Sequence, residues 1–175
     1  MSDNIYITLT DEKLLLYVME NLERAERRYD FDSRCWRELQ ERLKQNKFDK
    51  YLLPKLLDYL LKHNSGFLNI KDVNEIRSLI YDPDQLMTLI INCLKSRNDS
   101  GYGFDQNIEY ILTLCNQQLM KNDPDINKYR IEIINTLNTL KPYYLPGKPE
   151  SDIRITKLIN KIIIFLSQKE SILSN

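Results

Sequence analysis

Apolar side chains recur every three or four residues along almost the whole of this chain, which is the spacing of amphipathic helices. Polar or proline-containing stretches interrupt the pattern, so it predicts about eight successive helices. Glycine supplies only 4 of the 175 residues, which disfavours sheets with tight hairpins. We therefore predict an all-α fold, with helices at residues 11–29, 33–45, 50–62, 70–80, 83–94, 105–121, 124–140 and 151–168.

The same Asp-Pro-Asp sequence is expected to start two of these helices, at Asp82 and at Asp123. An aspartate before the first turn caps it, and proline fits the first helical position. The distance between the two motifs falls within the roughly 40–47 residues of a HEAT or armadillo repeat. Two architectures therefore remain open, an irregular antiparallel bundle and a short HEAT-like stack of helical hairpins.

Residues 4–9 have a different pattern, with alternating β-forming side chains. The alternation predicts a short strand or an extended arm, with Ile5, Ile7 and Leu9 packed on the helices while Tyr6 and Thr8 face water. No second strand pattern follows, so the alternative is that this segment adds to the sheet edge of a partner. We expect one domain over residues 1–175, with its helices between residues 11 and 170.

Composition narrows the classes of function. There are 25 basic and 25 acidic residues, so the basic excess typical of nucleic-acid binders is missing. The start of the sequence is not a signal peptide, and no apolar run approaches the ~20 residues of a membrane helix. Three cysteines in helical patterns indicate free, buried thiols. We expect a cytoplasmic protein that neither binds a membrane nor favours nucleic acid.

No pattern in the sequence indicates catalysis. His63 is the only histidine, and no zinc-ligand spacing, nucleophile motif or phosphate-binding glycine loop is present. His63 itself suits the last turn of a helix, where the helix dipole favours a cation. We therefore predict that the protein is not an enzyme and uses no cofactor or metal.

Loop composition gives the one positional signal. Short connections make successive helices antiparallel, so loops alternate between two ends of the fold. Residues 46–49, 82–84 and 122–125 fall at one end and contain no glycine. Residues 30–32, 63–69, 97–104 and 142–150 fall at the other end, with all four glycines and many aromatic residues. Long tyrosine-rich loops favour protein recognition, although rings such as Phe104 equally suit caps on the core.

We therefore predict a protein-binding edge formed by Asp30, Asp32, Asp99, Tyr102, Phe104, Asp105, Tyr143 and Tyr144. Small cytosolic inhibitors of the bacterial immunity-protein type cover the active site of a toxin in this way. The acids would complement the basic cleft of a nuclease toxin. No motif matches a named family, and we expect a monomer until the partner binds.

Two other functions stay open. One is a HEAT-like adaptor that binds a protein or peptide on a helical face. The other is a helical nucleic-acid-binding regulator that uses the arginines between residues 24 and 42. Acids alternate with these arginines at helical spacing, so ion pairs on a solvated helix face are the simpler interpretation.

Overall fold

The computed structural model describes residues 5–28, 32–62, 70–100, 106–121, 128–140 and 149–173. All regular structure in these ranges is helical, which confirms the all-α prediction. The elements are η1 (Ile5–Thr8), α1 (Asp11–Arg28), α2 (Ser33–Lys44), η2 (Lys50–Leu52), α3 (Leu53–Lys62), α4 (Ile70–Ser78), α5 (Pro83–Ser100), α6 (Gln106–Met120), α7 (Arg130–Thr139) and α8 (Pro149–Leu173).

The chain divides into two compact units, Met1–Tyr81 and Asp82–Asn175. Unit 1 contains η1, η2 and helices α1 to α4, and unit 2 contains helices α5 to α8. The boundary falls at the Asp82-Pro83 motif, where the sequence predicted the start of a helix. The assignment of residues 1–175 to one domain stays a prediction.

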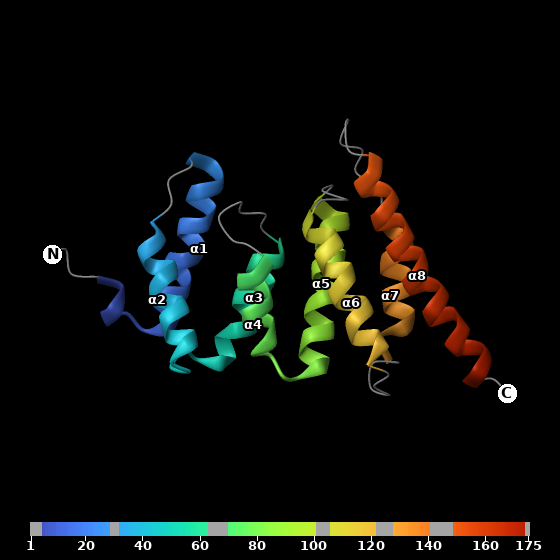
Figure 1. Ribbon diagram of the computed structural model, residues 1–175, viewed down its shortest axis with the longest axis horizontal. Helices are drawn as coiled ribbons and strands as arrows, with labels where there is room; N and C mark the ends of the chain where they lie inside the picture. The colour runs from blue at the N-terminus through green and yellow to red at the C-terminus, as the bar shows by residue number, and fades with distance from the viewer. Residues whose placement is uncertain are drawn as a thin grey trace. The chain divides into compact units, whose positions relative to one another are not determined.

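Each unit consists of two antiparallel helical hairpins (Figure 1). In unit 2, α5 pairs with α6 and α7 pairs with α8, while α5 also packs on α7 and α6 on α8. In unit 1, Tyr59 of α3 donates a hydrogen bond to the Met19 carbonyl of α1, and Gln40 of α2 donates one to Asp72 of α4. Each unit thus stacks first helix on first and second on second, the order of a hairpin stack.

The helix ends within each unit alternate as expected from up-and-down threading (Figure 1). The ends that flank residues 29–31 and 63–69 lie at one end of unit 1, and the turn after α2 lies at the other. In unit 2, the ends that flank residues 101–105 and 141–148 lie together. We call the end of unit 1 that carries residues 45–52 the turn end.

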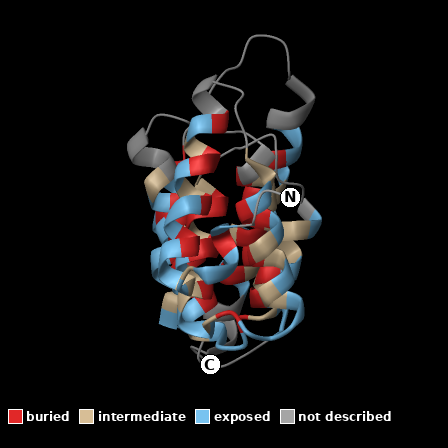
Figure 2. Ribbon diagram, turned by 90° about the vertical axis from the view of Figure 1, so that its left-hand side faces the viewer, coloured by how far each residue is buried: buried red, intermediate tan, exposed pale blue. Residues whose placement is uncertain are grey.

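Local capping residues place the helix starts where the sequence predicted them. Asp32 accepts a hydrogen bond from the backbone N–H of Arg34 and is the N-cap of α2. Asp82 accepts one from Asp84 over 2.9 Å, and Pro83 is the first residue of α5. Buried side chains line the faces that the helices turn toward one another (Figure 2).

The predicted N-terminal strand is wrong, because residues 5–8 form the 3-10 helix η1. The burial of three of its residues is also the reverse of what was expected: Tyr6 is 6% exposed, whereas Ile5 and Ile7 are 62% and 61% exposed. Thr8 is exposed, as predicted. The cause is long-range. Tyr6 donates a hydrogen bond to Asp32, and Arg42 binds carbonyls of the segment, so its backbone needs no partner strand.

Helix α7 begins at Arg130, later than the predicted start at Asp123. Residues 122–127 lie outside the described residues, so the second Asp-Pro-Asp motif stays untested as a cap. Ile133 and Leu137 are buried as expected, but Ile131 is exposed. Two residues correspond to roughly 200° around a helix, so Ile131 and Ile133 lie on opposite faces.

Helix α8 is buried along one face only, although isoleucine and leucine recur around most of its circumference. Ile155, Ile159, Ile162 and Leu166 are buried, but Ile153 and Ile164 are exposed. The helix packs on α6 and α7, and these partners cover only one stripe with helical spacing. The isoleucines outside that stripe therefore remain in contact with solvent.

Candidate functional site

The turn end of unit 1 owes its shape to the way in which α2 stops. Lys47 N–H donates to the Arg42 carbonyl and Asn46 N–H donates to the Leu43 carbonyl. This pair of hydrogen bonds is a Schellman motif, and Asn46 occupies its left-handed position with φ 56°. Glycine is the usual residue there, but asparagine tolerates the conformation. The chain therefore reverses direction within a few residues of Lys44.

A second capping residue fixes the next turn. Asp49 accepts a hydrogen bond from the backbone N–H of Tyr51 over 2.9 Å. The Asp49 N–H donates in turn to the carboxylate of Asp11, at the start of α1, over 2.7 Å. The turn is thus tied to α1 and to η2, while the ring of Tyr51 is 93% exposed.

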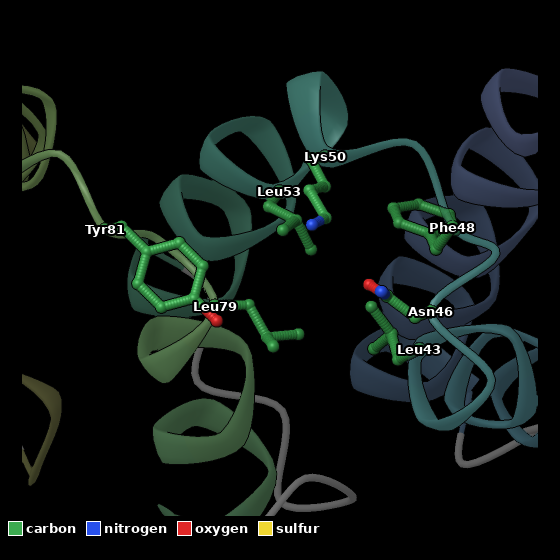
Figure 3. A pocket seen from close by; sticks show the side chains of 7 residues that line it. All are labelled: Leu43, Asn46, Phe48, Lys50, Leu53, Leu79 and Tyr81. Carbon is green, nitrogen blue, oxygen red and sulfur yellow. The ribbon is translucent and has the colours of Figure 1, made fainter.

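A hollow opens between the end of α2, the start of α3 and the segment after α4 (Figure 3). We call it the turn hollow; its lining residues are Leu43, Asn46, Phe48, Lys50, Leu53, Leu79 and Tyr81. Asn46 and Lys50 point toward each other across it, and leucines from three helical segments supply its apolar wall. Tyr81 lies at its edge and is 78% exposed.

The size of the turn hollow limits what it can accept. Its enclosed space is only ≈ 20 Å³, within an open depression of ≈ 280 Å³. Cofactor and substrate pockets usually measure about 300–1,000 Å³ and cover most of the ligand. The hollow therefore suits the tip of one side chain presented by another macromolecule.

Lysines are concentrated in the stretch of chain, residues 44–55, that supplies part of the turn hollow, and one of them, Lys50, lines the hollow. Lys44, Lys47, Lys50 and Lys55 are all exposed, and none forms an ion pair among the described residues. Asp49 is the one acid between residues 44 and 55, and its carboxylate caps η2. This stretch therefore carries a local positive charge in a chain whose formal net charge is zero.

A wider groove of ≈ 540 Å³ lies beside η1, and its wall includes Asp11, Glu38 and Arg42. These charged groups already have partners. Arg42 donates to Asp11 and Glu38, and to three carbonyls within residues 6–9. The groove is thus walled by a clamp that holds η1 on the helices, which makes it a weaker candidate than the turn hollow.

The structure places one of the eight predicted partner-binding side chains. Asp32 sits at the start of α2, where its carboxylate accepts hydrogen bonds from Tyr6 and from the Arg34 guanidinium. The Arg34 guanidinium, despite an opposing effect of burial, holds the pKa of Asp32 well below its usual range. Both carboxylate oxygens therefore already bind groups within unit 1.

The other predicted residues lie largely outside the described residues. Asp99 belongs to the last turn of α5 and not to a loop, because α5 continues to Ser100. Its side chain is not described. Asp30, Tyr102, Phe104, Asp105, Tyr143 and Tyr144 fall in residues 29–31, 101–105 and 141–148, which the structure does not describe.

Chemically reactive groups are buried or dispersed. Cys35, Cys93 and Cys115 are free and buried, as the sequence predicted. Burial raises the pKa of the Cys115 thiol to about 12, so it is protonated at neutral pH. The described residues contain no group of three or more His, Cys, Asp or Glu side chains that could hold a metal ion.

Helices in the described ranges are all too short or too polar to span a lipid bilayer.

The sequence interpretation missed Tyr51 and Tyr81. The helical pattern of residues 50–62 does not separate Tyr51 from its apolar neighbours, and the loop composition directs attention to the opposite end of the fold. Available signals were the position of Tyr81 directly before the Asp82-Pro83 cap and the four lysines between residues 44 and 55.

Comparison with known proteins identifies no matching family, no matching characterised protein and no matching solved structure.

Proposed function

We propose that this chain is a non-catalytic protein-binding domain and that the turn end of unit 1 is one of its contact surfaces. The observation that carries this proposal is the exposure of two tyrosine rings: Tyr81, which lines the turn hollow, is 78% exposed, and Tyr51, in η2 at the turn end, is 93% exposed. Tyrosine offers a large, stiff apolar area and a hydrogen-bonding tip, and it is enriched at the centres of protein interfaces.

The loop residues favour one particular protein-binding function, that of an inhibitor of the immunity-protein type. Such an inhibitor neutralises a toxin, for example a nuclease. In this form the loop edge with Tyr102 and Tyr143 covers the toxin's active site. The turn hollow is formed by residues of unit 1, whereas Tyr102 and Tyr143 belong to the sequence of unit 2, so the two surfaces can be tested separately by mutation.

A HEAT-like adaptor is the second candidate, and the stacking order of the hairpins within each unit supports it. Nucleic-acid binding is less well supported. Arg34 is paired with Asp32, Arg37 donates to Ser33, and Arg42 is held by the clamp beside η1. Much of the predicted arginine patch therefore has intramolecular partners.

Quantitative affinity capture from the native host, with the adjacent gene product co-expressed, tests the proposal. Four baits are compared: the wild type, Tyr51→Ala/Tyr81→Ala, Tyr102→Ala/Tyr143→Ala, and the control Ile153→Ala/Ile164→Ala, which removes two exposed side chains from α8. We expect one stoichiometric protein that the wild type and the control retain and that Tyr51→Ala/Tyr81→Ala loses.

If only Tyr102→Ala/Tyr143→Ala loses the retained protein, the contact surface is the loop edge and not the turn end. The inhibitor function would still stand. Failure of every bait to retain a stoichiometric protein would contradict the protein-binding function. Thermal unfolding of each variant is the accompanying control. Exposed positions away from special features change stability by only about 0.5 kcal/mol, so a large loss would mean that the rings pack in the core.

A further inference from the structure

We propose that the turn hollow binds an acidic segment of a partner protein that carries one apolar anchor side chain. This inference rests on the proposed function and specifies the chemistry of the partner. The anchor occupies the hollow between α2 and α3, and acids beside it face Lys50 in the lining and the other lysines of residues 44–55.

The charge around the hollow gives the first argument. Lys44, Lys47, Lys50 and Lys55 are exposed and have no ion-pair partner among the described residues, whereas Asp49 is engaged as the cap of η2. Glu41, at the near end of α2, shares its carboxylate with Gln45. The free charge between residues 44 and 55 is therefore positive, and complementary charge on a partner speeds association and favours the correct partner.

The interior of the hollow gives the second argument. Leu43, Leu53 and Leu79 form its wall, and Phe48 is buried behind the turn. Such a wall favours an aliphatic or aromatic tip, which gains roughly 25 cal/mol for each Å² removed from water. Lys50 and Asn46 point into the same space (Figure 3). They can hydrogen-bond the partner's backbone or an adjacent carboxylate while the anchor fills the apolar part.

The combination of these features favours a protein segment over a nucleic-acid strand. A phosphate backbone needs an extended track of cations, whereas Lys50 is the one lysine that lines this small hollow with its leucine wall. A base could stack on Tyr81, but the enclosed space of ≈ 20 Å³ suits the tip of one side chain and is too small for a base. Binding of RNA or DNA is therefore an outcome that would contradict the proposal.

Selection from a phage-displayed random peptide library, with the full-length chain as bait, tests the proposal. We expect the selected peptides to share a Leu, Ile, Met or Phe flanked by Asp or Glu. Lys47→Glu/Lys50→Glu should weaken a fluorescent synthetic copy of the consensus roughly tenfold or more. The matched control, Arg24→Glu/Lys71→Glu, makes the same change in net charge at exposed positions toward the other end of the hairpins, and should leave affinity within about twofold.

Two further measurements keep the result decisive. Replacing the anchor of the peptide with Ser should abolish measurable binding, and replacing its acids with amides should remove the salt dependence of the affinity. If Lys47→Glu/Lys50→Glu fails to fold by circular dichroism, Lys47→Gln/Lys50→Gln takes its place, because it removes the charges without reversing them.

The possible failures are distinguishable. If the selected peptides share an uncharged or basic consensus whose binding still requires Tyr81, the partner segment is not acidic. The protein-binding function would then stand without the proposed charge of the partner. The selection could yield no consensus that depends on the hollow while the affinity capture still retains a partner through Tyr102 and Tyr143. That result would overturn this inference and leave the protein-binding function in place. A 20-nucleotide poly(U) probe could instead bind more tightly than any selected peptide and lose this binding in Lys47→Glu/Lys50→Glu. That result would overturn both the acidic-segment inference and the protein-binding function of this surface.

Discussion

Arg42 and Asp11 form the central ion pair of unit 1, with Arg42 Nη1 donating to Asp11 Oδ1 over 2.6 Å. The two side chains are only 14% and 17% exposed. Arg42 uses all five of its N–H groups, because it also binds Glu38 and three carbonyls within residues 6–9. Asp11 uses its other oxygen to hold the Asp49 N–H. One arginine thereby joins η1, α1 and α2, and its ion-pair partner holds the turn that follows α2.

Replacement of Arg42 by Met should therefore destabilise the protein by about 3–5 kcal/mol, the usual cost of breaking a largely buried ion pair by removing one partner. The carbonyls of η1 and the carboxylate of Asp11 lose their donors together. Urea unfolding followed by circular dichroism measures the change in the free energy of unfolding. The control is Arg37→Met, because Arg37 is exposed and its one hydrogen bond within the described residues is to Ser33. Equal effects of the two substitutions would contradict the clamp.

Stability should depend on the charge of Asp32 in acid. Its pKa is depressed in the folded state by the Arg34 guanidinium, so the stabilisation is complete above the unfolded value of about 3.9 and is lost as pH falls toward the folded value. Asp32→Asn keeps a capping side chain but removes the charge. We expect it to melt below the wild type at pH 7, and the gap between the two melting temperatures to begin closing below about pH 4 and to keep closing as pH falls further.

Thermal unfolding between about pH 2 and pH 7 measures this convergence. Glu12→Gln is the control, because Glu12 is exposed in the first turn of α1. A difference between Asp32→Asn and the wild type that stays constant across the acid range would show that the ion pair with Arg34 does not contribute through its charge.

The buried thiols should resist modification until the fold opens. Cys115 is buried in α6, with a pKa of about 12, and the thiolate is the reactive form. We expect no reaction of Cys115 with 5,5′-dithiobis(2-nitrobenzoate) in native protein at pH 8 and rapid reaction in urea. A thiol whose pKa is raised by folding also withdraws stability as pH rises above about 8.5. Labelling of native Cys115 at the rate of a free thiol would contradict its burial.

Gln118 is a buried polar residue whose replacement should stabilise unit 2. It is almost fully buried in α6, and neither its side-chain oxygen nor its nitrogen has a hydrogen-bond partner. An unsatisfied buried amide costs roughly 1–3 kcal/mol. Gln118→Met keeps the shape and removes both polar atoms, so the melting temperature should rise by several degrees. Gln117 is exposed on the same helix, so the control Gln117→Met should leave the melting temperature nearly unchanged. A lower melting temperature of Gln118→Met would show that the buried amide has hydrogen-bond partners.

Local features of the fold were predictable because their energetics are local. The cap of α2 at Asp32, the proline start of α5 at Pro83 and the buried stripe of α1 each depend on residues within about one or two turns. Residues 5–8 were misinterpreted because their environment comes from Arg42, more than thirty positions away. Alternation alone cannot distinguish a strand from a short helix clamped by a distant side chain.

The candidate site likewise combines features that are visible locally in the sequence with features that depend on distant residues. Lysine density between residues 44 and 55 is visible in the sequence, but the hollow beside it requires Leu43, Leu53 and Leu79 from three separate segments. Nothing in the local pattern of Tyr51 distinguishes it from its buried neighbour Leu53, because the difference depends on which side of α3 is covered by α1 and α4.

The sequence by itself determined the helical class, most helix starts and the free state of the three cysteines, since periodicity and capping act over one or two turns. Only the tertiary structure decided that the hairpins stack in order within each unit, that one face of α8 stays exposed, and that a hollow with Tyr81 at its edge opens at the turn end. Those features arise where side chains distant in sequence exclude water together, and helical spacing specifies which stripe is apolar but not what will cover it.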